Sequence, residues 1–170
     1  MYVVDELDTV VQLHDAPWPD VGAPMPVILC NEHDLFLAYI VAAQETGGCR
    51  QLSPRMDGLP IAVVKFLFCY AHMLGPPNDE AFMGHPLASR GLERYAVFEV
   101  KQSSWIRQLE RMNAVHPSHK PELFVGYRHF VFAFHDSTFE VVADGFEVQL
   151  MSGSMRSAVS KMVEMFSQDN

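Results

Sequence analysis

The segment from Tyr127 to Val142, YRHFVFAFHDSTFEVV, constrains the fold more than any other part of the sequence. Neighbouring residues of a β-strand point to opposite faces of the sheet, so a strand here has two distinct faces. One face carries Phe130, Phe132 and Phe134. The other carries His129, Val131, Ala133 and His135. This alternation predicts a half-buried strand, and the polar residues 136–138, followed by a second apolar stretch, predict a hairpin with an antiparallel partner.

Shorter apolar stretches recur along the chain and predict further strands. They cover residues 9–13, 26–30, 35–42, 61–70, 95–100 and 146–150. Asp144-Gly145 predicts another two-residue turn between strands. One amphipathic helix is expected from a cap at Ser103 or Ser104 to about Asn113, and a second after Gly153-Ser154. The predicted fold is α+β: a mainly antiparallel sheet of about eight strands with two amphipathic helices packed on it.

Composition limits both the class of protein and its partners. The chain has 170 residues, 49% of them hydrophobic and 19% charged, which predicts a single folded domain over residues 1–170. Its net charge of −9 would repel phosphate backbones, so nucleic acid is not an expected partner. The apolar stretches are too short or too interrupted to span a bilayer, so no membrane association is expected.

The three cysteines and the first residues favour a cytoplasmic location. Acidic residues stand where a secretory signal would carry basic ones, and the cysteines form no Cys-x-x-Cys pair. Cys30 and Cys69 lie in apolar stretches and are expected to be inert core thiols. Cys49 follows two glycines and precedes Arg50, which could activate it, but an incidental thiol is the expected outcome because no histidine is near in sequence.

Eight histidines raise the question of a metal site, and His116 and His119 have the most ligand-like spacing. A transition-metal centre needs three or four donors, and no third donor accompanies this pair. Both residues follow a predicted helix end, where a partly cationic side chain interacts favourably with the helix dipole. We therefore expect no metal ion and no other cofactor.

Two segments carry the candidate functional residues. A long aperiodic loop over residues 75–91 gathers side chains able to bind a ligand or move a proton. We take Asn78, Asp79, Glu80, Ser89 and Arg90 as candidate ligand-binding residues. The candidate catalytic residues are His85, His135 and Asp136. Asp136 could orient His135, but it also suits an ordinary turn position, and the loop could simply cover a sheet edge.

Four motifs resemble those of a family of small uncharacterised bacterial proteins. They are GPPNDEA at 75–81, GHPL at 84–87, SSWI at 103–106 and FAFHDSTFE at 132–140. The resemblance covers most of the chain after about residue 60 and implies a bacterial, cytosolic protein. It implies no activity and no catalytic residue.

Two classes of function remain open. The first is a non-enzymatic binding or interaction protein for a protein partner or a small molecule, expected to form a homodimer. The second is a hydrolase-type enzyme that uses His85 or His135 as general base, with possible help from a metal. If a site exists, His85 is expected at its rim and His135 in its lining.

Overall fold

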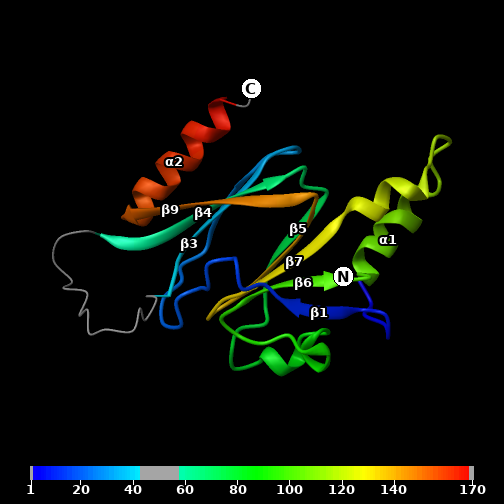
Figure 1. Cartoon of the computed structure of the whole chain (residues 1–170), viewed down its shortest axis with the longest axis horizontal. Coiled ribbons are helices and arrows are strands. Elements are labelled where there is room, and N and C mark those ends of the chain that lie inside the picture. Colours follow the sequence, from blue (N-terminus) through cyan, green and yellow to red (C-terminus); the bar gives the residue numbers. More distant parts are fainter. Residues whose placement is uncertain (1, 43–57, 169–170) are drawn as a thin grey trace.

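A computed structural model describes residues 2–42 and 58–168 and shows two antiparallel sheets packed face to face (Figure 1). The five-stranded sheet has the order β1-β6-β7-β8-β5, and the four-stranded sheet has the order β2-β3-β4-β9. The strands are β1 Thr9–Gln12, β2 Val27–Cys30, β3 Leu35–Ile40, β4 Leu59–Leu67, β5 Ala71–Gly75, β6 Val97–Lys101, β7 Arg128–Ala133, β8 Thr138–Ala143 and β9 Gly145–Gly153. The α+β prediction with antiparallel pairing is confirmed.

Two α-helices and three short 3₁₀ helices complete the fold. They are α1 Ser104–Asn113, α2 Met155–Gln168, η1 Phe82–Gly84, η2 Ala88–Arg90 and η3 Pro121–Gly126. Helix α2 lies across the outer face of the four-stranded sheet, where Ala158 and Met162 pack against Phe36. None of the described helices has the length and apolar character to cross a membrane.

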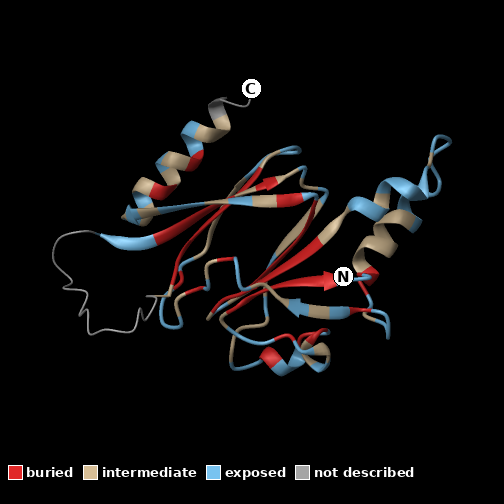
Figure 2. Ribbon diagram, viewed as in Figure 1, coloured by how far each residue is buried: buried red, intermediate tan, exposed pale blue. Residues whose placement is uncertain are grey.

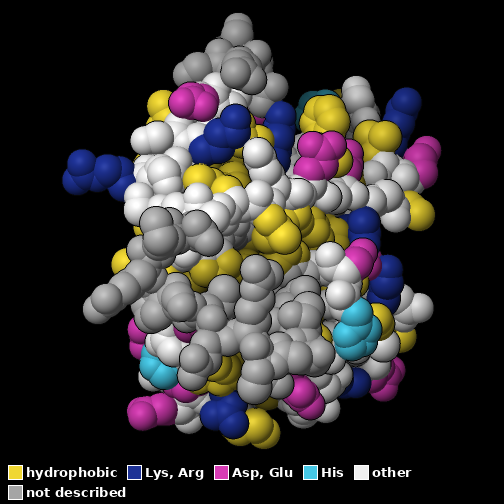
Figure 3. Space-filling model, turned by 60° about the vertical axis from the view of Figure 1, so that its left-hand side comes forward, with side chains coloured by type: hydrophobic (Ala, Val, Ile, Leu, Met, Phe, Trp, Pro, Cys, Tyr) yellow, Lys and Arg dark blue, Asp and Glu magenta, His cyan; other side chains and the backbone are white. Residues whose placement is uncertain are grey.

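Three apolar clusters hold the layers together. The largest lies between the sheets and contains the aromatic face of β7, with Phe132 in edge contact with Tyr39 and Phe66 of the other sheet. A second cluster covers the opposite face of the five-stranded sheet, and the third lies under α2. The central strands are therefore buried along most of their length (Figure 2). Apolar side chains also reach the surface on the face turned forward in Figure 3.

Strand β7 differs from the prediction in one respect, because both of its faces are buried. Phe130 and Phe132 face the inter-sheet core as expected, but Val131 and Ala133 are also 0% exposed. Tyr2, Phe82 and Leu87 lie over that second face, so segments remote in sequence cover it. The alternation of side chains along β7 does not indicate that remote segments bury its second face.

The β7–β8 hairpin is confirmed, with Ala133 paired to Thr138 and the Phe134 amide donating to the Ser137 carbonyl. The turn predicted at Asp144-Gly145 is instead a bend that carries the chain from one sheet to the other. Strand β8 belongs to the five-stranded sheet and β9 to the four-stranded sheet. Strand β5 was not predicted, because Ala71–Gly75 mixes small and polar residues and has no clear alternation.

Candidate functional site

A buried carboxylate, Glu140, joins four other segments of the chain on the outer face of the five-stranded sheet. The Tyr2 hydroxyl donates to Glu140 Oε2 at 2.5 Å, and His129 Nε2 lies 2.9 Å from the same oxygen. His85 Nε2 lies 3.3 Å from Oε1. Ser103 Oγ lies 2.9 Å from the other ring nitrogen of His129. All five residues are buried, so this cluster, the Glu140 network, is a polar core within the apolar one.

The hydrogen bonds assign the protons in the Glu140 network. Ser103 Oγ accepts from the amides of Trp105 and Ile106, so its own proton goes to His129 Nδ1, and His129 then donates through Nε2. His85 Nδ1 accepts from the Leu87 amide, so its Nε2 also donates to the carboxylate. Both ring nitrogens of each histidine therefore have a partner, and one nitrogen of each ring faces the Glu140 carboxylate.

Burial by itself would raise the pKa of Glu140. The hydrogen bonds from His129, His85 and Tyr2 outweigh it and lower the pKa to about 2. The pKa of the donor Tyr2 changes in the opposite direction, because burial and the nearby Glu140 carboxylate both raise it. The network therefore holds a charge in the interior by satisfying it completely.

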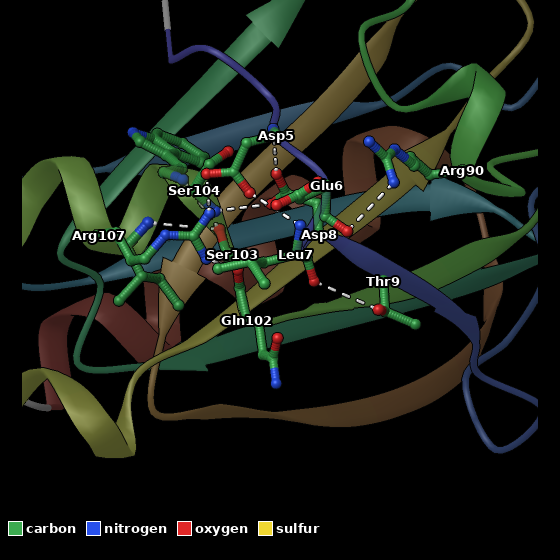
Figure 4. A network of polar contacts seen from close by, with 12 residues as sticks. Asp5, Glu6, Leu7, Asp8, Thr9, Arg90, Gln102, Ser103, Ser104 and Arg107 are labelled. Atoms are coloured by element: carbon green, nitrogen blue, oxygen red, sulfur yellow. Dashed lines mark hydrogen bonds and ion pairs between the residues drawn. The ribbon is translucent and has the colours of Figure 1, made fainter.

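Ser103, His129 and Glu140 have the order of a serine-hydrolase relay, but the serine is closed to substrate. Its hydroxyl points at His129, which is 0% exposed, and its oxygen caps α1 through two backbone amides. The amide of Ser104, a possible oxyanion donor, is held by Asp8 Oδ1 at 2.7 Å (Figure 4). The arrangement therefore fits a structural connection between β7, β8 and α1.

His85 belongs to this closed network and does not lie at the rim of a site. It is 5% exposed, and both of its ring nitrogens have partners. It shares no hydrogen-bond partner with His135, which contacts Asp79 and Tyr95. A general base needs a free nitrogen that a substrate can reach, and His85 has none in this conformation.

His135 meets one residue of the predicted loop, Asp79. His135 Nδ1 lies 3.1 Å from Asp79 Oδ2 and 3.1 Å from the hydroxyl of Tyr95. The Tyr95 hydroxyl also donates to Asp79, and this hydrogen bond lowers the pKa of the Asp79 carboxyl. Asp136 is farther away, at 4.0 Å from Nε2, and its side chain is largely exposed. The pair is therefore His135 with Asp79, with the histidine side chain 39% exposed and that of Asp79 14% exposed.

The other candidate residues of the loop do not join His135. Asn78 accepts the amide of Ala81 and so stabilises the turn before η1. Arg90 donates to the Glu6 carbonyl and ties η2 to the segment before β1. Glu80 and Ser89 are exposed. Only Asp79 of this set is brought to a histidine.

The histidine pair at 116 and 119 makes no shared site. His119 lies 2.7 Å from Glu110 and 3.0 Å from Asn113 through its two ring nitrogens, and His116 accepts the Ser118 amide. Within residues 2–42 and 58–168, no group of three His, Cys, Asp or Glu side chains is placed to hold a metal ion. Cys30 is exposed, so its prediction as a core thiol is wrong, whereas Cys69 is partly buried against the inter-sheet core. Cys49 lies outside the described residues.

A cleft of about 650 Å³ opens where β6, β7, α1 and η3 meet. Its charged lining residues are Glu99, Lys101, Arg107 and Arg128, three cations and one carboxylate. Its apolar lining comes from Leu7, Val100, Ile106, Phe124, Val125 and Tyr127. This volume is within the range of small-molecule sites, and we call it the cationic cleft.

Glu99 organises the cations of the cleft. Its side chain is only 6% exposed. Arg128 donates to both of its carboxylate oxygens, from Nε at 3.0 Å and from Nη2 at 2.8 Å, and Lys101 Nζ lies 2.6 Å from Oε1. Burial alone would raise the pKa of Glu99, but the hydrogen bonds from Arg128 and Lys101 lower it. Lys101 and Arg128 keep side-chain exposures of 53% and 42%, so both cations also face solvent.

Arg107 forms the other wall of the cationic cleft, near the start of α1. It donates to the Gln102 carbonyl and lies 2.5 Å from Asp5, whose side chain is half exposed (Figure 4). Asp5 is thus a second carboxylate beside the three cations of the cleft. With Asp5 counted, a local excess of one positive charge remains among these residues, in a chain whose net charge is −9.

Sequence reasoning missed both the Glu140 network and the cationic cleft. Glu140 looked like one polar residue of a strand, and Tyr2 lies 138 positions away from it. One signal was available: Glu99 lies on the strand predicted over residues 95–100 and Lys101 follows its predicted end. A strand one residue longer would point both side chains to one face, and an acid next to a base there could have indicated a charged site.

Comparisons of the chain with protein-family models, curated proteins and solved structures found no match. The resemblance to a bacterial family therefore stays a prediction, and the function must be argued from the geometry.

Proposed function

We propose that this protein is a non-enzymatic binding protein whose ligand is a small organic anion, held in the cationic cleft. The observation that carries the proposal is the local reversal of charge: three cations and one carboxylate line the cleft of an acidic protein. A carboxylate or phosphate head group would contact Lys101, Arg107 and Arg128. The apolar wall at Phe124 and Tyr127 suits an apolar or aromatic body.

Binding costs little reorganisation in this arrangement. Glu99 already holds Arg128 and Lys101 in place, so the side-chain entropy of two long cations is lost in folding and not on binding. The aromatic wall is ordered in the same way, because Tyr127 stacks on Tyr70 with ring centroids 3.7 Å apart. We place the protein in the bacterial cytosol, a location supported by the free thiols of Cys30 and Cys69.

The test is isothermal titration calorimetry with three probes: inorganic phosphate, acetate and phenylacetate. We expect phenylacetate to bind more tightly than acetate, because only phenylacetate fills the apolar wall. Lys101→Gln should weaken its binding about twofold to fivefold, the value of one partly exposed ionic contact. Lys120→Gln, an exposed lysine outside the cleft, is the matched control and should bind as the wild type does. Equal affinity in both variants would contradict the proposal.

A hydrolase-type activity is the second candidate, and the His135–Asp79 contact favours it. Asp79 holds Nδ1 of His135, so the other ring nitrogen, Nε2, points away from Asp79, and the histidine side chain is 39% exposed. A general base that is oriented by a carboxylate has this arrangement. A panel of ester, amide and phosphoester substrates tests this candidate. Turnover that is lost in His135→Asn and retained in His116→Asn would support it, and equal turnover in the two variants would exclude His135 as the base.

A further inference from the structure

The two sheets have four edge strands, and three of them are short and close to prolines. Strands β1 and β2 have four residues each, and β5 has five. Pro26 immediately precedes β2, Pro76 immediately follows β5, and Pro17 lies in the loop after β1. Short strands and nearby prolines are devices that discourage pairing with another chain, because proline has no amide proton to donate.

The fourth edge, β9, has none of these devices. It is nine residues long, contains no proline, and carries one charged side chain, Glu147. It pairs with β4 along its whole length on one side. Among the described residues, none gives β9 a second backbone partner on its other side. Leu150 on this strand is 64% exposed. A long apolar edge of this kind is suited to pairing with a further strand.

We infer that two copies of the chain associate through antiparallel pairing of their β9 strands, which joins the two four-stranded sheets into one sheet of eight. Along an antiparallel ladder, hydrogen-bonded and non-hydrogen-bonded residue pairs alternate. The two-fold axis of a symmetric pair must therefore pass between one residue and the same residue of the second copy, because an axis between two successive pairs would make pairs of different kinds equivalent. Gln149 is the midpoint of Gly145–Gly153, so an axis at Gln149 uses all nine residues.

This register is compatible with the side chains on both faces of β9. Glu147 lies opposite Met151 of the second copy, so no two like charges face each other. On the other face, Val148 lies opposite Leu150 of the second copy. Val148 already packs against the inter-sheet core, and pairing would extend that apolar surface over the exposed Leu150. An axis at Glu147 would instead oppose two carboxylates.

This inference does not depend on the cationic cleft, which is lined by other residues. The first measurement is the mass of the purified full chain by sedimentation equilibrium between 1 and 100 μM, about the range of specific homodimers. We expect twice the chain mass of 19.2 kDa over the upper part of this range. A monomer at every concentration would overturn the inference.

The second measurement places the interface with charge variants at the axis. Gln149 is exposed, so Gln149→Glu and Gln149→Lys should leave the fold intact, which circular dichroism checks. Each variant alone puts two like charges about 5 Å apart across the axis and should weaken the dimer at least tenfold. An equimolar mixture should restore it, because a glutamate then faces a lysine.

The control is Thr9→Glu, which adds a carboxylate to β1, an edge of the other sheet, and should leave dimerisation unchanged. A wild-type dimer that survives both Gln149 variants would place the interface elsewhere and overturn the inference. A mixture of the two variants that stays monomeric would do the same.

Discussion

Glu140 Oε2 lies 2.9 Å from His129 Nε2, a diagonal contact across two neighbouring strands, β7 and β8. Val131 is the direct cross-strand partner of Glu140 and Val142 that of His129, so the carboxylate reaches two pairs along the ladder to meet the histidine. The contact connects two central strands to the Tyr2, His85 and Ser103 segments. One substitution at Glu140 therefore acts on segments that are up to 138 positions apart in the sequence.

Glu140→Gln should lower the free energy of unfolding by about 3 kcal/mol at pH 7. The amide can accept fewer hydrogen bonds and carries no charge, so two histidines and a tyrosine lose a charge-assisted partner. Urea unfolding of both proteins measures the difference. Glu80→Gln, at an exposed position, is the control and should unfold at the wild-type midpoint.

The same carboxylate should make stability depend on acid pH. Its pKa lies at about 2 in the folded protein and at the ordinary value of 4.5 when unfolded, so the unfolded chain binds the extra proton between these values. The stabilisation is fully present above about pH 4.5 and is lost as pH falls toward 2. It amounts to about 3 kcal/mol on the usual conversion.

Unfolding of wild type and Glu140→Gln between pH 7 and 2.5 measures this dependence. The gap between the two proteins should shrink as the pH falls below about 4.5. A gap of constant size across this window would show that Glu140 does not titrate with the lowered pKa.

Two adjacent serines should respond in opposite ways to alanine. Ser103→Ala removes the cap of α1 and the proton donor to His129, and should cost about 2 kcal/mol. Ser104 is buried, and its hydroxyl has no hydrogen-bond partner among the described residues. Ser104→Ala should therefore leave stability unchanged or raise it by up to about 1 kcal/mol. Thermal unfolding of both variants compares them, and equal losses would contradict the assignment.

Both faces of β7 should be sensitive to truncation. Phe132→Ala should destabilise by about 3 to 5 kcal/mol, because it leaves a cavity between the sheets. Val131→Ala removes two buried methyl groups from the opposite face and should cost about 2 kcal/mol. Val3→Ala, at an exposed position, should cost almost nothing. A wild-type midpoint for Val131→Ala would mean that the segments over this face do not cover it in solution.

Local patterns predicted the elements that depend on local physics. The alternation around Phe132, the polar turn before Thr138 and the serine cap of α1 each involve residues a few positions apart, and each is observed. The bend at Asp144-Gly145 was wrongly predicted as a hairpin turn. The same turn residues serve a chain that reverses within one sheet and a chain that passes from one sheet to another. Here Phe146 packs against Phe66 of the four-stranded sheet, which the turn residues themselves do not indicate.

The candidate site was predicted only where one loop meets one strand end. Asp79 and His135 come together because the loop after β5 passes the end of β7, where the Asp79 amide donates to the His135 carbonyl. The cleft gathers Lys101, Arg107 and Arg128 from three elements, and the Glu140 network gathers five segments. Such convergence depends on topology, which residue spacing does not encode.

The contact between Tyr2 and Glu140 also sets an order of events during protein synthesis. The two residues are 138 positions apart, and a ribosome adds about 5 to 20 residues per second. Tyr2 must therefore wait roughly 7 to 28 seconds after its own incorporation before its acceptor exists. Throughout that interval the Tyr2 hydroxyl lacks its acceptor, although the partner strand of β1 is made before the interval ends, so the polar core can be completed only after residue 140 has been added.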